Sequence, residues 1–391
     1  MKFNSLGKRI AENYRILALI VLNSIIVLLV VNLLASGIID FRDYYRKKAE
    51  SGEGRYGFKN YEDSTKKLFP DLERDEIEQF LTDTRHLSQC FDTYTQFKER
   101  PFVGKSVNVD AKGFRPIKNQ GPWPPAPEHI NIFVFGGSTT FGYGVPDVET
   151  IPSYLQEILN CEHNGRVRVY NFGRGGYISI QERVLLEKLI LEGMVPQVAI
   201  FIDGLNDLGY CQEEPNFTNE LTKYMDEGDS PPFIKNVMQM PIFKLIFDYP
   251  REKAKVQTSL SKEKITNTIR RYEVNKEIIE SFCSHFNIEP LFVWQPVPVY
   301  KCDQDYNFFA TFNYDRYMSY LRVGYQEMAN IFANRKFGEN FLWLTDMQEG
   351  LREPLYADAI HYSPYLCKLI AQKIADKLEE QKMIKDVSVN R

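Results

Sequence analysis

The pattern of apolar and polar positions begins with one long uncharged segment, Ile16 to Ile39. As an α-helix this segment would rise about 36 Å, whereas the hydrocarbon core of a bilayer is about 30 Å thick. A cleaved signal peptide has a shorter apolar region of about 7–15 residues. The pattern therefore predicts an uncleaved transmembrane helix at residues 16–39. The residues that interrupt its apolar run are Asn23, Ser24, Asn32, Ser36 and Gly37.

The charges around this segment leave its orientation open. A short basic tail, residues 1–15, precedes the segment, and residues 42–48 after it carry as many basic side chains. The positive-inside comparison therefore does not decide between the two sides. From the short tail and the single span, we expect a single-pass membrane protein whose large domain is extracytoplasmic.

Residues 40–128 are more polar and are punctuated by Gly and Pro. Within them, Asp71 to Phe91 has the apolar spacing of an acidic amphipathic helix. The run from Gly121 to Pro127 holds four prolines and is a stiff, extended connection. We interpret residues 40–128 as a juxtamembrane stalk followed by a small lead-in subdomain.

From residue 129 to residue 385, short apolar runs alternate with helical patterns. The helical patterns are Ser153 to Leu159, Ile180 to Leu191 and Lys262 to Ser284. Buried strands that alternate with helices predict an α/β fold with a mostly five-stranded parallel sheet covered on both faces. The apolar runs are Ile130 to Phe135, Val167 to Tyr170, Val198 to Ile202, Glu289 to Trp294 and Phe341 to Leu344.

An insertion at residues 208–261 interrupts this alternation and is rich in aromatic and Met side chains. Such side chains above a strand-end site would make an adaptable acyl-binding lid. They would equally well form the core of a satellite subdomain, so both interpretations stay open. The apolar residues concerned are Tyr210, Phe217, Tyr224, Met225, Phe233, Met238, Met240, Ile242, Phe243, Phe247 and Tyr249.

Composition excludes several other classes of protein. The 391 residues carry 48 basic and 52 acidic side chains, a net charge of −4, which is not the electrostatic footprint of a nucleic-acid binder. The six cysteines form no Cys-x-x-Cys pair, which argues against a zinc site. Their even number permits disulfides in an extracytoplasmic domain, but their spacing does not select pairs.

Small and polar residues follow the predicted strands, at the edge of the sheet where open α/β folds bind ligands. Ser138 lies in such a turn, after Gly136 and Gly137. It could project its hydroxyl from the turn as a nucleophile, or it could cap the following helix, a position that serine favours. The motif Gly-Lys-Ser/Thr of a phosphate-binding loop is missing here, which disfavours a nucleotide site.

Among the five histidines, His361 stands out because Asp358 lies three positions earlier. This spacing allows a carboxylate to hold one imidazole nitrogen while the other nitrogen faces a nucleophile, the geometry that serine activation requires. The same pair could also decorate the N-terminus of a helix, so the spacing alone leaves both interpretations open.

Taken together, four short blocks resemble those of the SGNH/GDSL hydrolases, in the order typical of that family. The resemblance covers about residues 130–378 and implies the family's flavodoxin-like, three-layer fold for the domain at residues 129–385. The blocks are Gly137-Ser138, Asn171-x-Gly173-x-x-Gly176, Gly204-x-Asn206-Asp207 and Asp358-x-x-His361.

The resemblance implies a role for each matching residue. Ser138 would be the nucleophile, His361 the general base and Asp358 the acid that orients it. The oxyanion hole would combine the N–H groups of Ser138 and Gly176 with the side-chain amide of Asn206. The family uses neither a metal nor an organic cofactor, so we expect none here.

One position departs from the family pattern. The first block reads Gly-Gly-Ser-Thr, so Gly137 stands where the family name has an aspartate. The change removes a carboxylate beside the nucleophile and puts the fine positioning of that turn in doubt, although not the identity of the serine.

These observations predict a membrane-anchored serine esterase that hydrolyses carboxylic esters through an acyl-enzyme. We expect acetyl or short acyl esters of an envelope glycan as substrates. Lipid esters, acyl transfer to a glycan hydroxyl, and glycan binding without catalysis on the same scaffold are the alternatives. Nothing in the sequence indicates a nucleic-acid partner.

Overall fold

The computed structural model describes residues 2–49, 66–211, 214–218, 221–222, 240–242, 261–308, 315–335 and 337–385. The chain divides into two compact units. One consists of Met1–Gly57 and Glu220–Thr258, and the other of Phe58–Asn219 and Ser259–Arg391. Much of the predicted insertion lies outside the described residues, including Tyr224, Met225, Phe233, Met238, Phe243, Phe247 and Tyr249.

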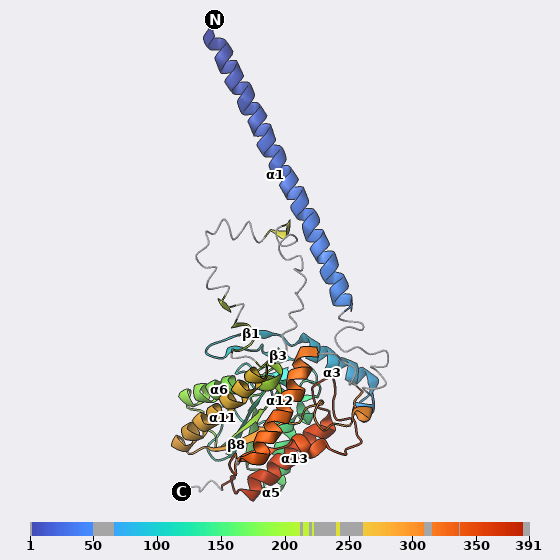
Figure 1. Cartoon of the computed structure of the whole chain (residues 1–391), viewed down its shortest axis with the longest axis vertical. Coiled ribbons are helices and arrows are strands. Elements are labelled where there is room, and N and C mark those ends of the chain that lie inside the picture. Colours follow the sequence, from blue (N-terminus) through green and yellow to red (C-terminus); the bar gives the residue numbers. More distant parts are fainter. Residues whose placement is uncertain are drawn as a thin grey trace. The chain divides into compact units, whose positions relative to one another are not determined.

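The larger unit (Figure 1) contains a five-stranded sheet. Its strand order is β6-β5-β7-β8-β9. All of its strand pairings are parallel. The predicted α/β fold with a five-stranded parallel sheet is therefore confirmed, and each predicted strand matches to within one residue at its ends. The strands are β5 (Ile130–Gly136), β6 (Val167–Asn171), β7 (Val198–Asp203), β8 (Glu289–Trp294) and β9 (Phe341–Trp343).

Helices follow the strands and cover both faces of the sheet. Each of the three predicted helical patterns corresponds to a helix, and the remaining helices follow β5, β7 and β9 or precede β9. The long helices are α5 (Ile151–Glu162), α6 (Ser179–Leu191), α11 (Lys262–His285), α12 (Asp315–Asn334) and α13 (Pro364–Glu380), and the short ones are α4 (Ser138–Phe141) and α7 (Leu205–Tyr210).

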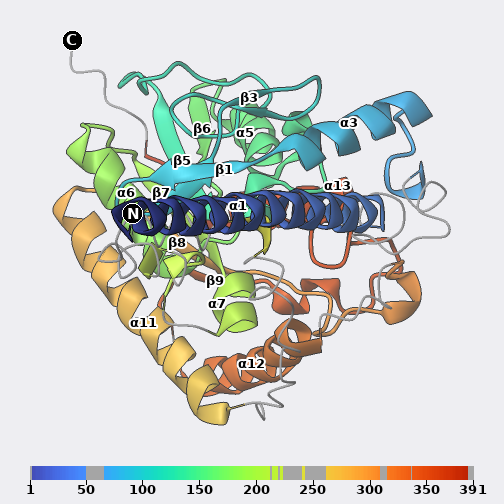
Figure 2. The same cartoon turned by 90° about the horizontal axis from the view of Figure 1, so that it is seen from above.

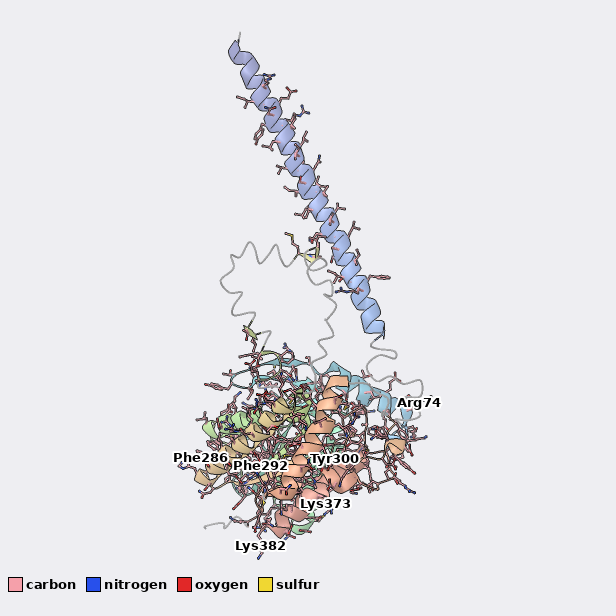
Figure 3. The ribbon with its side chains drawn as sticks, in the orientation of Figure 1. Arg74, Phe286, Phe292, Tyr300, Lys373 and Lys382 are labelled. Atoms are coloured by element: carbon pink, nitrogen blue, oxygen red, sulfur yellow. The ribbon has the colours of Figure 1, made fainter. Side chains whose placement is uncertain are left out.

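Successive side chains of a strand point to opposite faces of the sheet. The two faces of this sheet carry different kinds of side chain. One face is aliphatic and packs against α5 and α13, while the other is aromatic and packs against α6, α11 and α12 (Figure 2). On the aromatic face the rings of Phe135, Phe201 and Phe292 stack across three neighbouring strands, with centroids 5.1 and 5.4 Å apart. Phe292 is labelled in Figure 3. Burial of such rings supplies much of the stability that holds the strand ends in place.

The region before the sheet contains α3 (Arg74–His86) and two small hairpins. The hairpins are β1 (Gln89–Asp92) with β2 (Gln96–Glu99), and β3 (Phe102–Val103) with β4 (Asn108–Val109). The predicted helix from Asp71 to Phe91 is therefore wrong at its C-terminal end. Gln89–Asp92 is a strand because it pairs with Gln96–Glu99. The local apolar spacing does not indicate this pairing.

The N-terminal segment forms one continuous helix, α1 (Lys2–Ala49). Its part Arg9–Arg42 has a mean hydropathy of 2.9 and is long and apolar enough to cross a membrane. A signal sequence passes the same test of length and composition. The predicted helix is confirmed, while its insertion in a membrane and its orientation stay predictions, as do the boundaries of the tail, stalk and lead-in subdomain.

Candidate active site

Ser138 lies just after the inner strand β5, where the short helix α4 begins. Gly137 has an extended conformation, and Ser138 is the first residue of the helix, with its side chain at the sheet edge. The residue is 9% exposed. Its hydroxyl is therefore held in a tight turn at the carboxyl end of the sheet.

Asp358 and His361 lie on a closed loop before α13. Tyr356 and Tyr362 pair as an antiparallel bridge across the base of this loop, and the His361 carbonyl accepts a hydrogen bond of 2.8 Å from the Ala357 N–H. This closure fixes the backbone on both sides of the carboxylate and the imidazole.

The two segments meet in one hydrogen-bonded chain of three side chains. The Ser138 hydroxyl lies 2.8 Å from Nε2 of His361, and Nδ1 of His361 lies 2.6 Å from Oδ2 of Asp358. A carboxylate only accepts, so Nδ1 is the donor to Asp358, and Nε2 is left to accept the serine proton. The geometry is that of an activated serine nucleophile.

The carboxylate of Asp358 is stabilised in its charged form. Burial alone would raise its pKa, but the neighbouring His361 and the N–H groups of Ile360 and His361 outweigh burial and lower the pKa below its ordinary value of 3.8. Those two N–H groups lie 2.9 and 2.8 Å from Oδ1. Asp358 is thus a charged, fully hydrogen-bonded partner for the imidazole.

Asn206, on the short helix α7, places its amide beside the serine turn. Its Nδ2 donates to the Tyr177 carbonyl at 2.7 Å, which fixes which end of the amide is nitrogen. A β-carbon added to Gly137 would lie 2.4 Å from that nitrogen. The amide nitrogen therefore lies next to Gly137, the residue that precedes Ser138.

Gly176 lies on the loop after β6 with a φ of +81°, a conformation that favours glycine. A β-carbon there would also lie 2.8 Å from Nδ2 of Asn216. The same Nδ2 donates to the Gly176 carbonyl at 3.3 Å. The described start of the insertion thus contacts the loop that carries Gly176.

Asn206 is contacted by a residue that the sequence did not assign to the site. Tyr317, on α12, donates its hydroxyl to Oδ1 of Asn206 at 3.2 Å, with the Leu205 carbonyl at 3.3 Å. This contact and the one to Tyr177 hold opposite ends of the amide. No local pattern marks Tyr317, because it lies more than a hundred residues after its partner.

Gln295, just after β8, connects the segment that carries Ser138 with the loop that carries His361. Its Oε1 accepts hydrogen bonds from Thr139 at 2.7 Å and from Tyr362 at 2.8 Å. These residues directly follow Ser138 and His361. Gln295 is 2% exposed, so it is a buried link between the segment that carries Ser138 and the loop that carries His361.

Glu99, at the end of the lead-in hairpin, contacts the loop before Gly176. Its Oε1 accepts the Gly175 N–H at 2.6 Å, while Gln89 donates to the Gly175 carbonyl at 3.0 Å. The carboxyl is fully buried, and burial raises its pKa although the nearby Arg174 opposes this. The β1–β2 hairpin therefore braces the backbone that presents Gly176.

No protein-family model matches the chain, and no curated protein sequence matches it. Solved structures do. The chain is similar in fold to known esterases. The esterase EstA from a Pseudoalteromonas species, inhibited by monoethylphosphonate, has 13% identity and a TM-score of 0.35, with 65% of this chain and 98% of that chain covered.

Two further structures have similar values. An acetyl xylan esterase, AlAXEase, shares 13% identity over 63% of this chain and 98% of its own, with a TM-score of 0.34. A lipase/acylhydrolase from Enterococcus faecalis shares 13% over 64% of this chain and 96% of its own, with a TM-score of 0.36. At this identity the likeness concerns the fold, so the roles of individual residues depend on the geometry of the site itself.

The described residues contain no group of three or more His, Cys, Asp or Glu side chains arranged to hold a metal ion. In the described part of the chain, which contains all six cysteines, no disulfide is formed, and three of the cysteines are buried.

Proposed function

We propose that the protein is a serine esterase that hydrolyses carboxylic esters through an acyl-enzyme. The observation that carries this proposal is the hydrogen-bonded chain from Ser138 through His361 to Asp358, with 2.8 and 2.6 Å between its members. This chain connects a hydroxyl to a base and the base to a hydrogen-bonded carboxylate, as serine-dependent acyl transfer requires.

In the first half of the reaction, Oγ of Ser138 attacks the ester carbonyl carbon and His361 accepts the hydroxyl proton at Nε2. The resulting imidazolium is stabilised by Asp358. The tetrahedral intermediate collapses when His361 returns the proton to the leaving alcohol, which leaves the acyl group on Ser138.

The developing oxyanion would be held by the N–H groups of Ser138 and Gly176 and by Nδ2 of Asn206. In support, Nδ2 lies beside Gly137, and one of its two hydrogens is already directed to Tyr177. The other remains to bind the oxyanion. In the second half, water attacks the acyl-enzyme with His361 as base, and the same three donors stabilise the second intermediate.

We also propose that α1 anchors the enzyme in a membrane and that the catalytic domain is extracytoplasmic. The length and hydropathy of Arg9–Arg42 support the anchor. The expected substrates are acetyl or short acyl esters of an envelope glycan. Lipid esters, transfer of the acyl group to a glycan hydroxyl, and glycan binding without turnover are the alternatives.

A series of p-nitrophenyl esters from acetyl to palmitoyl tests this proposal, with wild type and Ser138→Ala compared in parallel. Turnover in the wild type that is lost in the variant supports the serine mechanism, and the preferred chain length distinguishes short acyl from lipid substrates. Addition of a glycan acceptor distinguishes transfer, which would give an acylated glycan, from hydrolysis. Ligand retention with no turnover on any ester would favour the binding role.

A further inference from the structure

Within residues 9–42 of α1, one narrow face is covered and the remaining residues are exposed. Between residues 9 and 42, Ala35 is buried, at 2% exposure, and Asn32, Ser36 and Ile39 are half-buried. All other residues in this range are exposed. The covered positions are spaced by three and four, so they form a single stripe along the helix. A specific contact surface, not general burial, accounts for this pattern.

The insertion contacts this stripe at Asn32. The compact unit that contains α1 also contains Glu220–Thr258, and within that segment Met240–Ile242 is described and half-buried. The N–H of Ile242 donates to Oδ1 of Asn32 at 3.2 Å. A polar side chain of the apolar helix is therefore paired with the backbone of the insertion.

The position of this contact along the helix sets its depth if α1 spans a bilayer. Asn32 lies about 24 Å along the helix from Ile16, and Ile39 lies about 10 Å farther. The contact thus falls in the last third of the apolar stretch, inside the boundary of the hydrocarbon core. A free amide or a free backbone N–H costs several kcal/mol there, so each needs a partner.

The sequence of the contact segment suits an apolar surrounding. Met240, Pro241 and Ile242 carry no polar side-chain group apart from the soft sulfur of Met240. Pro241 has no N–H, and the N–H of Ile242 is bonded to Asn32. Of the three residues, only Met240 has an N–H that is not bonded to Asn32. This reduces the free-energy cost of placing the segment among lipid chains.

We propose that Met240–Ile242 of the insertion enters the membrane beside α1 and that Asn32 holds it there by accepting the Ile242 N–H. The partner of this segment is the acyl-chain region of the bilayer. The inference depends on the membrane anchor of the proposed function but not on its chemistry. At its described start, the insertion contacts the loop that carries Gly176 through Asn216.

Cysteine cross-linking of the full chain in membranes tests the contact directly. Asn32→Cys combined with Ile242→Cys is expected to form an intramolecular disulfide on mild oxidation, detected as a reducible shift in gel mobility. The matched control combines Asn23→Cys with Ile242→Cys, because Asn23 lies nine residues away on the opposite side of the helix. Each single variant controls for the native cysteines. Absence of the first disulfide, or equal formation in the control pair, would overturn the proposal.

A second measurement does not depend on forming that disulfide. In membranes, Met240→Cys should resist a water-soluble maleimide and react after detergent is added. Adding Asn32→Leu should raise its labelling rate in membranes by about threefold, the effect of losing a typical membrane hydrogen bond, whereas Asn23→Leu should leave it unchanged. Rapid labelling of Met240→Cys in intact membranes would contradict the proposal.

An activity measurement separates this inference from the proposed function. Asn32→Leu should lower hydrolysis of esters presented in phosphatidylcholine vesicles while leaving hydrolysis of soluble p-nitrophenyl acetate unchanged, and Asn23→Leu should change neither. A wild type inactive on both substrates would count against the esterase, while the cross-link would still decide the membrane contact. An equal loss on both substrates would overturn the inference.

Discussion

The amide of Asn206 occupies the space that a side chain at position 137 would need. A β-carbon on Gly137 would lie 2.4 Å from Nδ2 of Asn206, a separation at which one of the two must move. Because Gly137 has no β-carbon, it leaves room for the Asn206 amide beside the proposed nucleophile.

Gly137→Ala should therefore lower kcat by about 10²–10³-fold, the loss expected when one oxyanion donor is displaced, with little change in KM. Steady-state kinetics on a soluble ester measure this. In an Asn206→Ala background the space is free, so the same substitution should cost much less. Equal losses in both backgrounds would show that Gly137 is needed for another reason.

Tyr317 should act on the reaction through Asn206. Tyr317→Phe removes one hydrogen bond, worth about 0.5–1.5 kcal/mol, so kcat should fall about 2- to 12-fold. A double-mutant cycle with Asn206→Ala checks the route: once the amide is gone, losing the Tyr317 hydroxyl should have no further effect on kcat. Additive losses would contradict a positioning role.

Tyr170 offers a matched control for this variant. Its hydroxyl donates to the Pro122 carbonyl at 2.6 Å, away from the catalytic groups. Tyr170→Phe loses a comparable hydrogen bond and should leave kcat unchanged. A similar fall in kcat for both variants would point to a general effect on folding.

Asp358→Asn should reduce kcat by about 10⁴-fold, because the amide no longer selects the imidazole tautomer that leaves Nε2 free to accept a proton. The same variant tests the electrostatics through stability. The folded-state pKa of Asp358 lies below its ordinary value of 3.8, so the carboxylate adds stability above that pH and loses it as the pH falls through the folded-state pKa.

The difference in unfolding free energy between wild type and Asp358→Asn should therefore be larger at pH 6 than at pH 3. Chemical denaturation of the full chain in detergent at the two pH values measures it. A difference that does not change with pH would mean that the carboxylate is not stabilised by His361 and the loop amides.

Local sequence patterns were sufficient to predict the alternating strands and helices around the five-stranded sheet. The apolar runs located all five strands of the sheet, because buried parallel strands are continuously apolar. The positions after strand ends and the spacing of the four blocks predicted the candidate site residues Ser138, Asp358, His361, Gly176 and Asn206. The distances now place the first three in one hydrogen-bonded chain.

Contacts between segments far apart in the chain have no corresponding local pattern in the sequence. Glu99 comes from a hairpin that the local apolar spacing assigned partly to a helix, and its role depends on reaching Gly175, far along the chain. Tyr317 looks like any apolar position of an amphipathic helix. What fixes these side chains is packing between elements, which depends on the folded sheet and not on neighbouring residues.

The central claim, that Ser138 is an acylated nucleophile, is tested most directly by active-site labelling. The full chain in detergent would be treated with an alkyl fluorophosphonate and its peptides analysed by mass spectrometry. We expect one adduct, on Ser138, that disappears in Ser138→Ala and forms much more slowly in His361→Ala, with loss of ester hydrolysis in step with labelling. No adduct on Ser138, together with ester hydrolysis that survives Ser138→Ala, would contradict the account.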